Sequence, residues 1–187
     1  MSYVDICELK HFNTRLLNKI IIVILGSLSI ALSAQVSVPL QPVPVTLQTF
    51  AVSLVSAIFG PIMGTQMVLL YLFEGIVGLP VFTNFSCGLM TLLEPTGGYL
   101  IGFIFAAWLT GYLLKKGETK NSVYVFLAVL SGHFLLFLLG YVRLAHFIGY
   151  KNAYLFGIAP FYTIEATKLL LLTLIISRLK WKHMLAY

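Results

Sequence analysis

Charge is scarce in this sequence, in which Asp, Glu, Lys and Arg together make up 10% of the 187 residues. Soluble domains carry roughly 25%. Four long stretches contain no charged residue at all: 20–73, 75–93, 95–114 and 121–142. Uncharged, mainly apolar stretches of about 18 or more residues are typical of membrane-spanning helices. The sequence therefore excludes an ordinary water-soluble domain.

Cysteine and the common catalytic motifs are scarce as well. Cys7 and Cys87 lack metal-binding spacing, so they indicate neither a disulfide framework nor a zinc site. No Gly-x-x-x-x-Gly-Lys-Ser/Thr, His-Glu-x-x-His or Gly-x-Ser-x-Gly pattern occurs, and the histidines are scattered at positions 11, 133, 146 and 183. We expect no enzyme of a familiar class, no cofactor and no ATP hydrolysis by a phosphate-binding loop. Any coupling to ATP must come from partner proteins.

The net charge of +6 could suggest nucleic acid, but the Lys and Arg residues flank apolar segments instead of forming a patch laced with aromatic residues. Such placement is typical of membrane topology. We expect the lipid bilayer as a partner and no nucleic acid.

The uncharged stretches predict an all-α integral membrane protein, a single membrane domain over residues 1–187. Prolines interrupt the first stretch near residues 35–46, and Gly60, Pro61 and Gly64 form a turn signal further along. A second break lies at 80–95. The expected spans are 17–34, 47–59, 62–79, 96–114, 122–142 and 155–178.

Six spans place most Lys and Arg residues on one side together with both termini, which the positive-inside rule makes cytoplasmic. The second span is short, because 13 residues cover only about 20 Å, and residues 47–79 could be one kinked span. That alternative would carry Lys115, Lys116 and Lys120 across the membrane. A second alternative, a signal peptide cleaved near residues 31–34, would leave five spans.

Three ionisable residues lie within the expected spans: Glu74, Glu165 and Lys168. Such groups are costly in a membrane, about 2.5 to 3.5 kcal/mol each, and they usually mark functional sites. Glu165 and Lys168 are spaced i, i+3, so they share one helix face. They either neutralise each other or present a cation and an acceptor to a ligand. Glu74 either contacts a ligand or pairs with Arg143 or Lys168.

The breaks at 35–46 and 80–95 are rich in Pro, Gly and small polar residues, with Glu94 as their one charge. Irregular backbone at membrane depth is tolerated where it lines a cavity, so we interpret both breaks as lids over a pocket. Small residues at four-residue spacing, such as Ser27 and Ala31, permit close helix packing, either within the bundle or against a partner subunit.

Three motifs carry a resemblance to a known family. The segments at 42–48 (Pro-Val-Pro-Val-Thr-Leu-Gln), 78–82 (Gly-Leu-Pro-Val-Phe) and 95–99 (Pro-Thr-Gly-Gly-Tyr) resemble, in order and spacing, those of the BioY family of biotin transporters. The resemblance extends over most of residues 20–178. It implies a substrate-binding S component of an energy-coupling factor (ECF) transporter, with six membrane helices. It also implies a membrane T subunit, which would meet Ser27 and Ala31, and two ATPase subunits, although a solitary carrier stays possible.

The last helix of that family typically carries Pro-Gly-Asp-x-x-Lys, whose acidic and basic residues bind biotin. Lys168 of Thr-Ile-Glu-Ala-Thr-Lys matches directly, whereas Glu165 replaces the usual Asp. The family loop after the second motif is usually glycine-rich, whereas residues 83–88 here contain one glycine. Glu74, Glu94 and Arg143 also depart from the residues usual at their places.

The resemblance implies biotin uptake across a bacterial cytoplasmic membrane. We expect biotin, the transported substrate, to enter between the two lids and to bind Lys168 and Glu165. Further candidate contacts are Gln48, Tyr71, Phe82, Asn84 and Ser86. The alternatives are another vitamin on the same fold, or an intramembrane enzyme that uses Glu165 or Glu74 as a general acid or base.

Overall fold

The computed structural model describes the backbone of residues 3–117 and 121–178, and side chains from residue 16 onward within these ranges. This part of the chain is almost entirely helical. Its elements are α1 (Tyr3–Gln35), β1 (Ser37–Val38), β2 (Val45–Thr46), α2 (Gln48–Ile76), η1 (Thr83–Phe85), α3 (Leu89–Leu93), α4 (Gly97–Lys116), α5 (Ser122–Ile148), α6 (Tyr150–Gly157), η2 (Ala159–Phe161) and α7 (Tyr162–Arg178).

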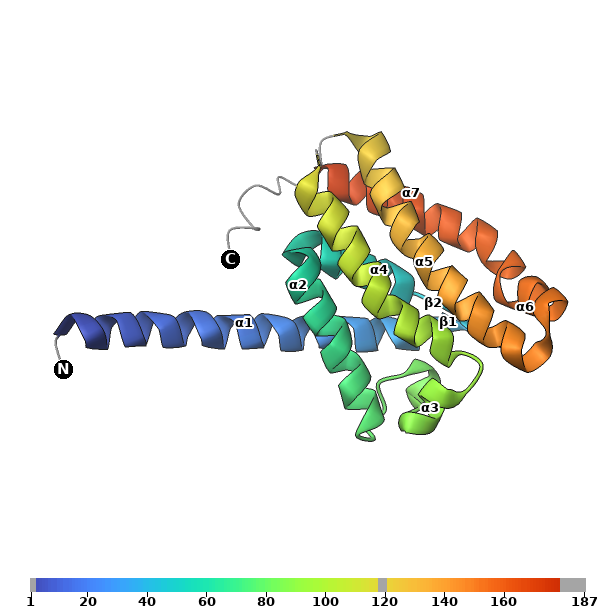
Figure 1. The fold of residues 1–187 in the computed structure, drawn as a ribbon, viewed down its shortest axis with the longest axis horizontal. Helices are drawn as coiled ribbons and strands as arrows, with labels where there is room; N and C mark the ends of the chain where they lie inside the picture. The colour runs from blue at the N-terminus through green and yellow to red at the C-terminus, as the bar shows by residue number, and fades with distance from the viewer. Residues whose placement is uncertain (1–2, 118–120, 179–187) are drawn as a thin grey trace.

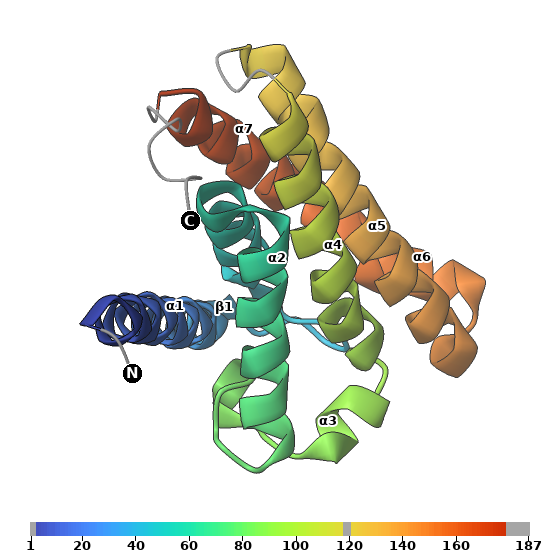
Figure 2. The same ribbon diagram turned by 60° about the vertical axis from the view of Figure 1, so that its left-hand side comes forward.

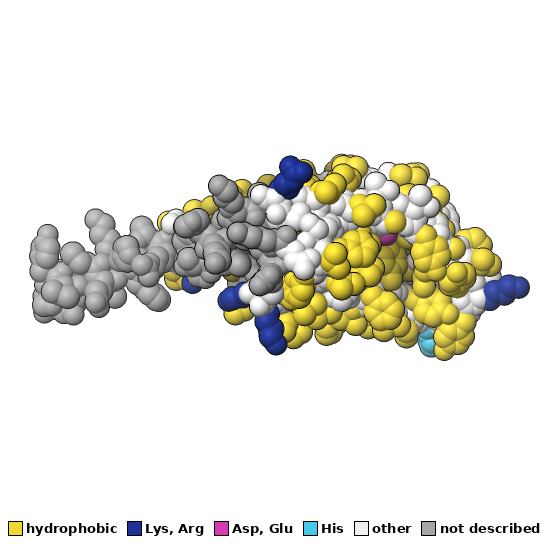
Figure 3. Space-filling model, turned by 90° about the horizontal axis from the view of Figure 1, so that it is seen from above, with side chains coloured by type: hydrophobic (Ala, Val, Ile, Leu, Met, Phe, Trp, Pro, Cys, Tyr) yellow, Lys and Arg dark blue, Asp and Glu magenta, His cyan; other side chains and the backbone are white. Residues whose placement is uncertain are grey.

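The exterior of the bundle is apolar. Within the described residues, five helical stretches are long and apolar enough to cross a membrane: 16–35, 48–76, 97–116, 122–148 and 150–178. Seen from above, hydrophobic side chains cover much of the surface and the Lys and Arg side chains lie near its margins (Figure 3). This pattern is typical of a helical bundle whose outer faces contact lipid.

Helix α2 is bent back on itself. Gly60 has φ 78° and ψ −179°, and Pro61 follows it. The Gln48 and Tyr71 side chains are hydrogen-bonded at 2.6 Å although they are 23 positions apart, a separation that spans about 34 Å in a straight helix. Residues 48–59 and 61–76 therefore form two antiparallel arms. They correspond to the expected spans 47–59 and 62–79.

Helix α4 lies between α2 and α5 at the centre of the bundle (Figures 1 and 2). Glycines permit this packing, because a Cβ on Gly111 would lie 2.7 Å from the Pro61 nitrogen, and one on Gly102 would lie 3.0 Å from the Leu136 oxygen. Helix α1 packs against α2 along one face only, and its N-terminal half extends well away from the bundle (Figure 1).

The C-terminal third differs from the expected pattern. Helix α5 continues to Ile148 instead of ending at 142, and Gly149 ends it with φ 80°. The expected span at 155–178 is divided into α6, η2 and α7, with Pro160 at the start of η2. Positive φ favours glycine, and proline cannot continue a helix by hydrogen bonding, so these two residues account for the breaks.

The two irregular connections meet near the N-terminal end of α4. The first is a short antiparallel pair in which Ser37 lies opposite Thr46 and Val38 opposite Val45. The second contains η1 and α3, and Figure 1 places α3 below the start of α4. Together they cover the cavity described next.

Candidate functional site

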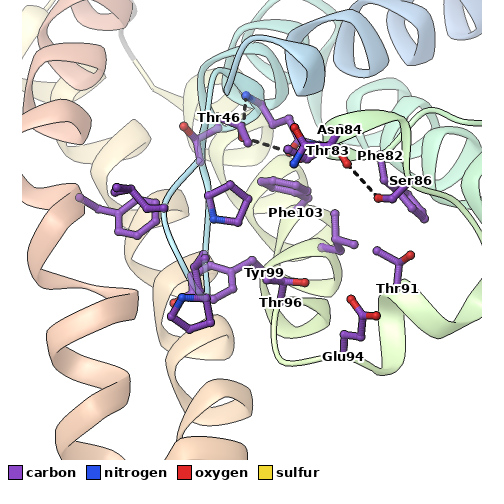
Figure 4. A pocket seen from close by; sticks show the side chains of 18 of the residues that line it. Thr46, Phe82, Thr83, Asn84, Ser86, Thr91, Glu94, Thr96, Tyr99 and Phe103 are labelled. Atoms are coloured by element: carbon purple, nitrogen blue, oxygen red, sulfur yellow. Dashed lines mark hydrogen bonds between the residues drawn. The ribbon is translucent and has the colours of Figure 1, made fainter. Parts of the chain in front are cut away.

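A cavity of about 310 Å³ lies between the two irregular connections and helices α4, α5 and α7. This volume is at the lower end of the range for small-molecule sites. Figure 4 shows the loop residues Thr83, Asn84 and Ser86 on one side, and Tyr99 and Phe103 of α4 on another. The lining residues used below are Thr46, Gln48, Thr49, Phe82, Thr83, Asn84, Ser86, Glu94, Tyr99, Phe103, Phe137, Phe161 and Glu165.

A buried ionic cluster forms the inner wall of the cavity. Glu165 and Lys168 of α7 are only 6% and 8% exposed, and Lys168 Nζ lies 2.6 Å from Glu165 Oε1. Lys168 Nζ also donates to the Thr46 carbonyl oxygen at 2.6 Å and to Thr49 Oγ1 at 3.0 Å. The Thr49 hydroxyl in turn donates to Glu165 Oε1 at 3.1 Å. Residues from three segments therefore meet at one carboxylate.

Lys168 has no donor left for a ligand in this arrangement. An ammonium group has three N–H bonds, and its three acceptors here are Glu165, Thr46 and Thr49. Lys168 does not line the cavity, whereas Glu165 does. The lysine therefore lies one layer behind the surface that a ligand would meet.

His133 of α5 joins the cluster from the opposite side of Glu165. Its Nε2 lies 3.3 Å from Glu165 Oε2, and its ring is 4% exposed. In the sequence His133 is one of four scattered histidines, and no role was predicted for it. The available signal was an ionisable side chain inside the uncharged stretch 121–142, which is unusual for a membrane helix.

Gln48 and Tyr71 form a second polar pair, of which only Gln48 lines the cavity. Tyr71 is fully buried, and its hydroxyl accepts a hydrogen bond from Gln48 Nε2. Gln48 Oε1 accepts from the Thr46 hydroxyl at 3.0 Å and the Thr83 hydroxyl at 3.3 Å. Tyr71 therefore supports the wall from behind, where it also packs edge-on against Phe82.

The loop of residues 82–86 carries Asn84 and Ser86, which both line the cavity. Asn84 and Phe85 each have φ 58°, a conformation that is uncommon outside glycine. Gln35, the last residue of α1, holds this loop: its Nε2 donates to the Phe82 carbonyl at 3.0 Å, and its Oε1 accepts from the Phe85 N–H at 3.1 Å. No sequence pattern predicted this role for Gln35.

Aromatic rings make up much of the remaining wall, and of these only Phe82 was predicted from the sequence. Tyr99 stacks on Phe161 with 6.5 Å between ring centroids, and it meets Phe137 edge-on at 5.9 Å. The Tyr99 hydroxyl donates to the Gly157 carbonyl at 2.8 Å, so its ring has a fixed position. Phe103 adds a further buried ring.

Glu74 and Arg143 do not pair with each other or with Lys168, which corrects the pairing considered from sequence. Glu74 accepts a hydrogen bond from the Ser27 hydroxyl of α1. The Arg143 guanidinium donates to the Leu93 carbonyl at the end of α3, at 2.5 Å. Each residue therefore joins two elements of the bundle, outside the cavity lining.

Ser27 and Ala31, expected at a partner-docking face, are both buried. They lie on the side of α1 that packs against α2, where Ser27 contacts Glu74. In this conformation neither side chain is available to a partner. The exposed face of α1 carries Leu25, Leu28 and Leu32 instead.

The comparison with known families decides which family this chain represents. The BioY family model matches residues 8–184. This chain belongs to the BioY family. The resemblance carried by the three motifs is thereby confirmed.

Two BioY relatives have names that state a transported compound. The chain is 37% identical over 150 residues to the probable biotin transporter BioY of Pyrococcus horikoshii, a match covering 80% of this chain and 88% of that protein. It is 38% identical over 152 residues to the biotin transporter BioY of Thermotoga maritima, covering 81% and 89%.

The fold agrees with the family. The chain superposes on the crystal structure of the S-component for biotin from an ECF-type ABC transporter with a TM-score of 0.80. The match covers 89% of this chain and 92% of that one, at 24% sequence identity. The expected S-component-like helical bundle is thus confirmed.

Proposed function

We propose that this BioY chain is the biotin-binding S component of an ECF transporter and serves biotin uptake across a bacterial cytoplasmic membrane. The observation that carries the proposal is the small cavity whose inner wall presents a buried carboxylate, Glu165, among aromatic rings. Family membership indicates biotin as the ligand, and the side chains that line the cavity can be compared with the chemical groups of biotin.

Biotin combines a bicyclic ring system, whose ureido group offers two N–H donors, with a flexible chain that ends in a carboxylate. The Glu165 carboxylate, which lines the cavity, can accept N–H donors, and hydrogen bonds to a charged group contribute about 1.5 to 3 kcal/mol each. Tyr99 and Phe103 provide apolar contact area for the rings. Gln48, Asn84 and Ser86 supply further polar contacts around the ligand.

Lys168 acts in this proposal from behind the cavity surface. It compensates the charge of Glu165 and holds the Thr46 carbonyl and Thr49 in place. A ligand carboxylate reaches the ammonium group directly only by replacing one of these three acceptors.

Transport requires partners in this proposal. Equal binding of a ligand to two conformations shifts neither of them, so binding alone cannot drive accumulation. We infer that a T subunit and two ATPase subunits supply the energy, and that both termini face the cytoplasm with them. A partner docking along α1 in the present conformation would meet Leu25, Leu28 and Leu32.

The direct test is equilibrium binding of biotin to the purified chain in detergent, measured by isothermal titration calorimetry. We expect a 1:1 complex of nanomolar affinity that excess thiamine or riboflavin does not displace. Folded protein that binds no biotin would overturn the proposal. Folded protein that prefers another vitamin would keep the S-component role and reject biotin as the ligand.

Gln35→Ala tests whether the end of α1 holds the loop at 82–86 against the ligand. The change removes two hydrogen bonds to the loop backbone, worth about 0.5 to 1.5 kcal/mol each. We expect the dissociation rate of biotin to rise about tenfold, with a smaller effect on association. Stopped-flow displacement of a fluorescent biotin analogue measures both rates.

The matched control is Gln66→Ala, which removes an exposed glutamine of α2 outside the cavity lining. It should leave both rates unchanged. Gln35→Glu keeps an acceptor for the Phe85 N–H but lacks the donor to Phe82, so an intermediate rate is expected. Equal rates for Gln35→Ala and the wild type would show that the loop holds its position without this residue.

A further inference from the structure

His133 lies in the wall that separates the cavity from the membrane-facing surface. Glu165, Phe137 and Phe161 line the cavity and also a second, apolar groove between α5 and α7, which His133 lines as well. Figure 3 shows acidic atoms within the apolar surface on this side of the molecule. Glu165 therefore lines both the cavity and the groove, whereas His133 lines the groove alone.

The hydrogen bonds of the His133 ring restrict its protonation. Nδ1 lies 3.0 Å from the Val129 carbonyl oxygen, which can only accept, so Nδ1 carries a hydrogen. In a neutral imidazole Nε2 then carries none and presents a lone pair. That lone pair faces Glu165 Oε2 at 3.3 Å.

The contact is attractive only when one proton lies between these two atoms. The proton either makes His133 an imidazolium facing a carboxylate, or makes Glu165 a carboxylic acid that donates to Nε2. Neither Nε2 nor Oε2 has another hydrogen-bond partner within the described residues. Without the proton, the lone pairs of Nε2 and Oε2 repel each other. This repulsion favours rotation of the Glu165 side chain away from His133.

The other described ionisable groups near His133 and Glu165 make no hydrogen bond to the Nε2 and Oε2 atoms of the pair. Lys168 is bonded to the opposite oxygen of Glu165, on the same helix. Glu94 lines the outer part of the cavity, and the phenols of Tyr141 and Tyr162 line the groove. From α2 the neutral hydroxyl of Thr49 contacts Glu165, and from α4 the hydroxyl of Thr110 lies against Gly132, the neighbour of His133 in the chain.

We propose that His133 is a positioning residue for Glu165, and that the two share one proton which keeps the carboxyl group aimed at biotin. The proposal rests on the function proposed above. When the proton is lost at rising pH, Glu165 leaves its position and the affinity for biotin falls. His133 thus sets the pH dependence of biotin binding without touching biotin.

Two substitutions at His133 distinguish the effect of the shared proton from the effect of side-chain packing. Glutamine places an amide N–H near the Nε2 position but cannot release it, whereas leucine fills the space without a donor. We expect the affinity of the wild type to fall at least tenfold between about pH 5 and pH 9. His133→Gln should remove this dependence. His133→Leu should bind ten- to a hundredfold more weakly than the wild type at acidic pH, the effect of losing one hydrogen bond to a charged group.

The matched control is His146→Gln, which changes an exposed histidine of the same helix. It should keep the pH profile of the wild type. Identical pH profiles for His133→Gln and the wild type, or wild-type affinity in His133→Leu, would overturn the proposal.

A measurement without biotin keeps this inference distinct from the proposed function. Nitrogen-15 NMR of the ligand-free protein, labelled at histidine and assigned with His133→Gln, reports the protonation of both ring nitrogens. We expect a ring with hydrogen on Nδ1 and a proton shared at Nε2 that is lost as the pH rises. If the His133 ring shares no proton at any pH, the inference is rejected even where biotin binds. If the protein does not bind biotin, the proposed function is rejected, and the NMR result alone tests whether His133 and Glu165 share a proton.

Discussion

Replacement of Lys168 by methionine is expected to abolish biotin binding and to destabilise the protein. The change leaves Glu165 buried at 6% exposure without its lysine partner, and it frees the Thr46 carbonyl and Thr49 as well. Removing one partner of a buried ion pair costs about 3 to 5 kcal/mol, out of a total stability of about 5 to 15 kcal/mol. Calorimetric titration with biotin and thermal unfolding followed by tryptophan fluorescence measure the two effects.

A double variant separates the two effects of Lys168. Combining Lys168→Met with Glu165→Gln removes both charges, so we expect most of the thermal stability to return while biotin binding stays lost. Lys151→Met, at an exposed lysine of α6, is the matched control and should behave as the wild type. A single Lys168→Met variant with unchanged affinity and unfolding temperature would show that the cluster has no role in either property.

Gly111→Leu is expected to prevent α4 from packing against the bend of α2. A Cβ at this position would lie 2.7 to 2.8 Å from backbone atoms of Gly60 and Pro61, and backbone cannot move aside as a side chain can. Overpacking a core usually costs about 1 to 3 kcal/mol, and a clash with backbone belongs at or above the upper end. We expect little monodisperse protein after extraction and a clearly lower unfolding temperature for what remains.

The variant Phe105→Leu provides the control, because it places the same side chain on the exposed face of α4. It should be extracted and unfold as the wild type does. If Gly111→Leu instead yields the wild-type amount of protein with the wild-type unfolding temperature, the close approach of α4 to residues 60–61 is not a requirement of the fold.

The distribution of charge predicted helix ends to within a few residues where uncharged stretches end near a proline or a lysine, as at Gln35 of α1 and Lys116 of α4. It failed at Arg143, which was taken to mark the end of a span at 142, whereas α5 continues to Ile148. The reason is that the long guanidinium side chain reaches the Leu93 carbonyl, so a charge is accommodated within the helix. The break at Gly149 lies within the connection expected between residues 142 and 155. The second break, at Ile158 and η2, was not predicted, because Pro160 lies among apolar residues.

Some residues that line the cavity were predicted from the sequence. Others were not, because they are brought to the site by contacts between distant segments. Glu165, Gln48 and Asn84 stand out from their surroundings as polar residues in apolar or motif-bearing segments, and all three line the cavity. Thr49 is 116 positions from the carboxylate that it contacts, and no local pattern links them. Helices in lipid are as apolar outside as inside, so the periodicity of α5 does not reveal that His133 faces inward.

The bend of α2 also has a consequence for the backbone itself. It lies against α4 one helical turn before Lys115 and Lys116, and Gly60 is buried there. The first residues of any helix have N–H groups without an acceptor in the helix, and each such group is costly in an apolar environment. The second arm begins with Pro61, which has no N–H. The turn thus reverses the chain inside the bundle with one fewer unsatisfied donor than any other residue at that position would leave.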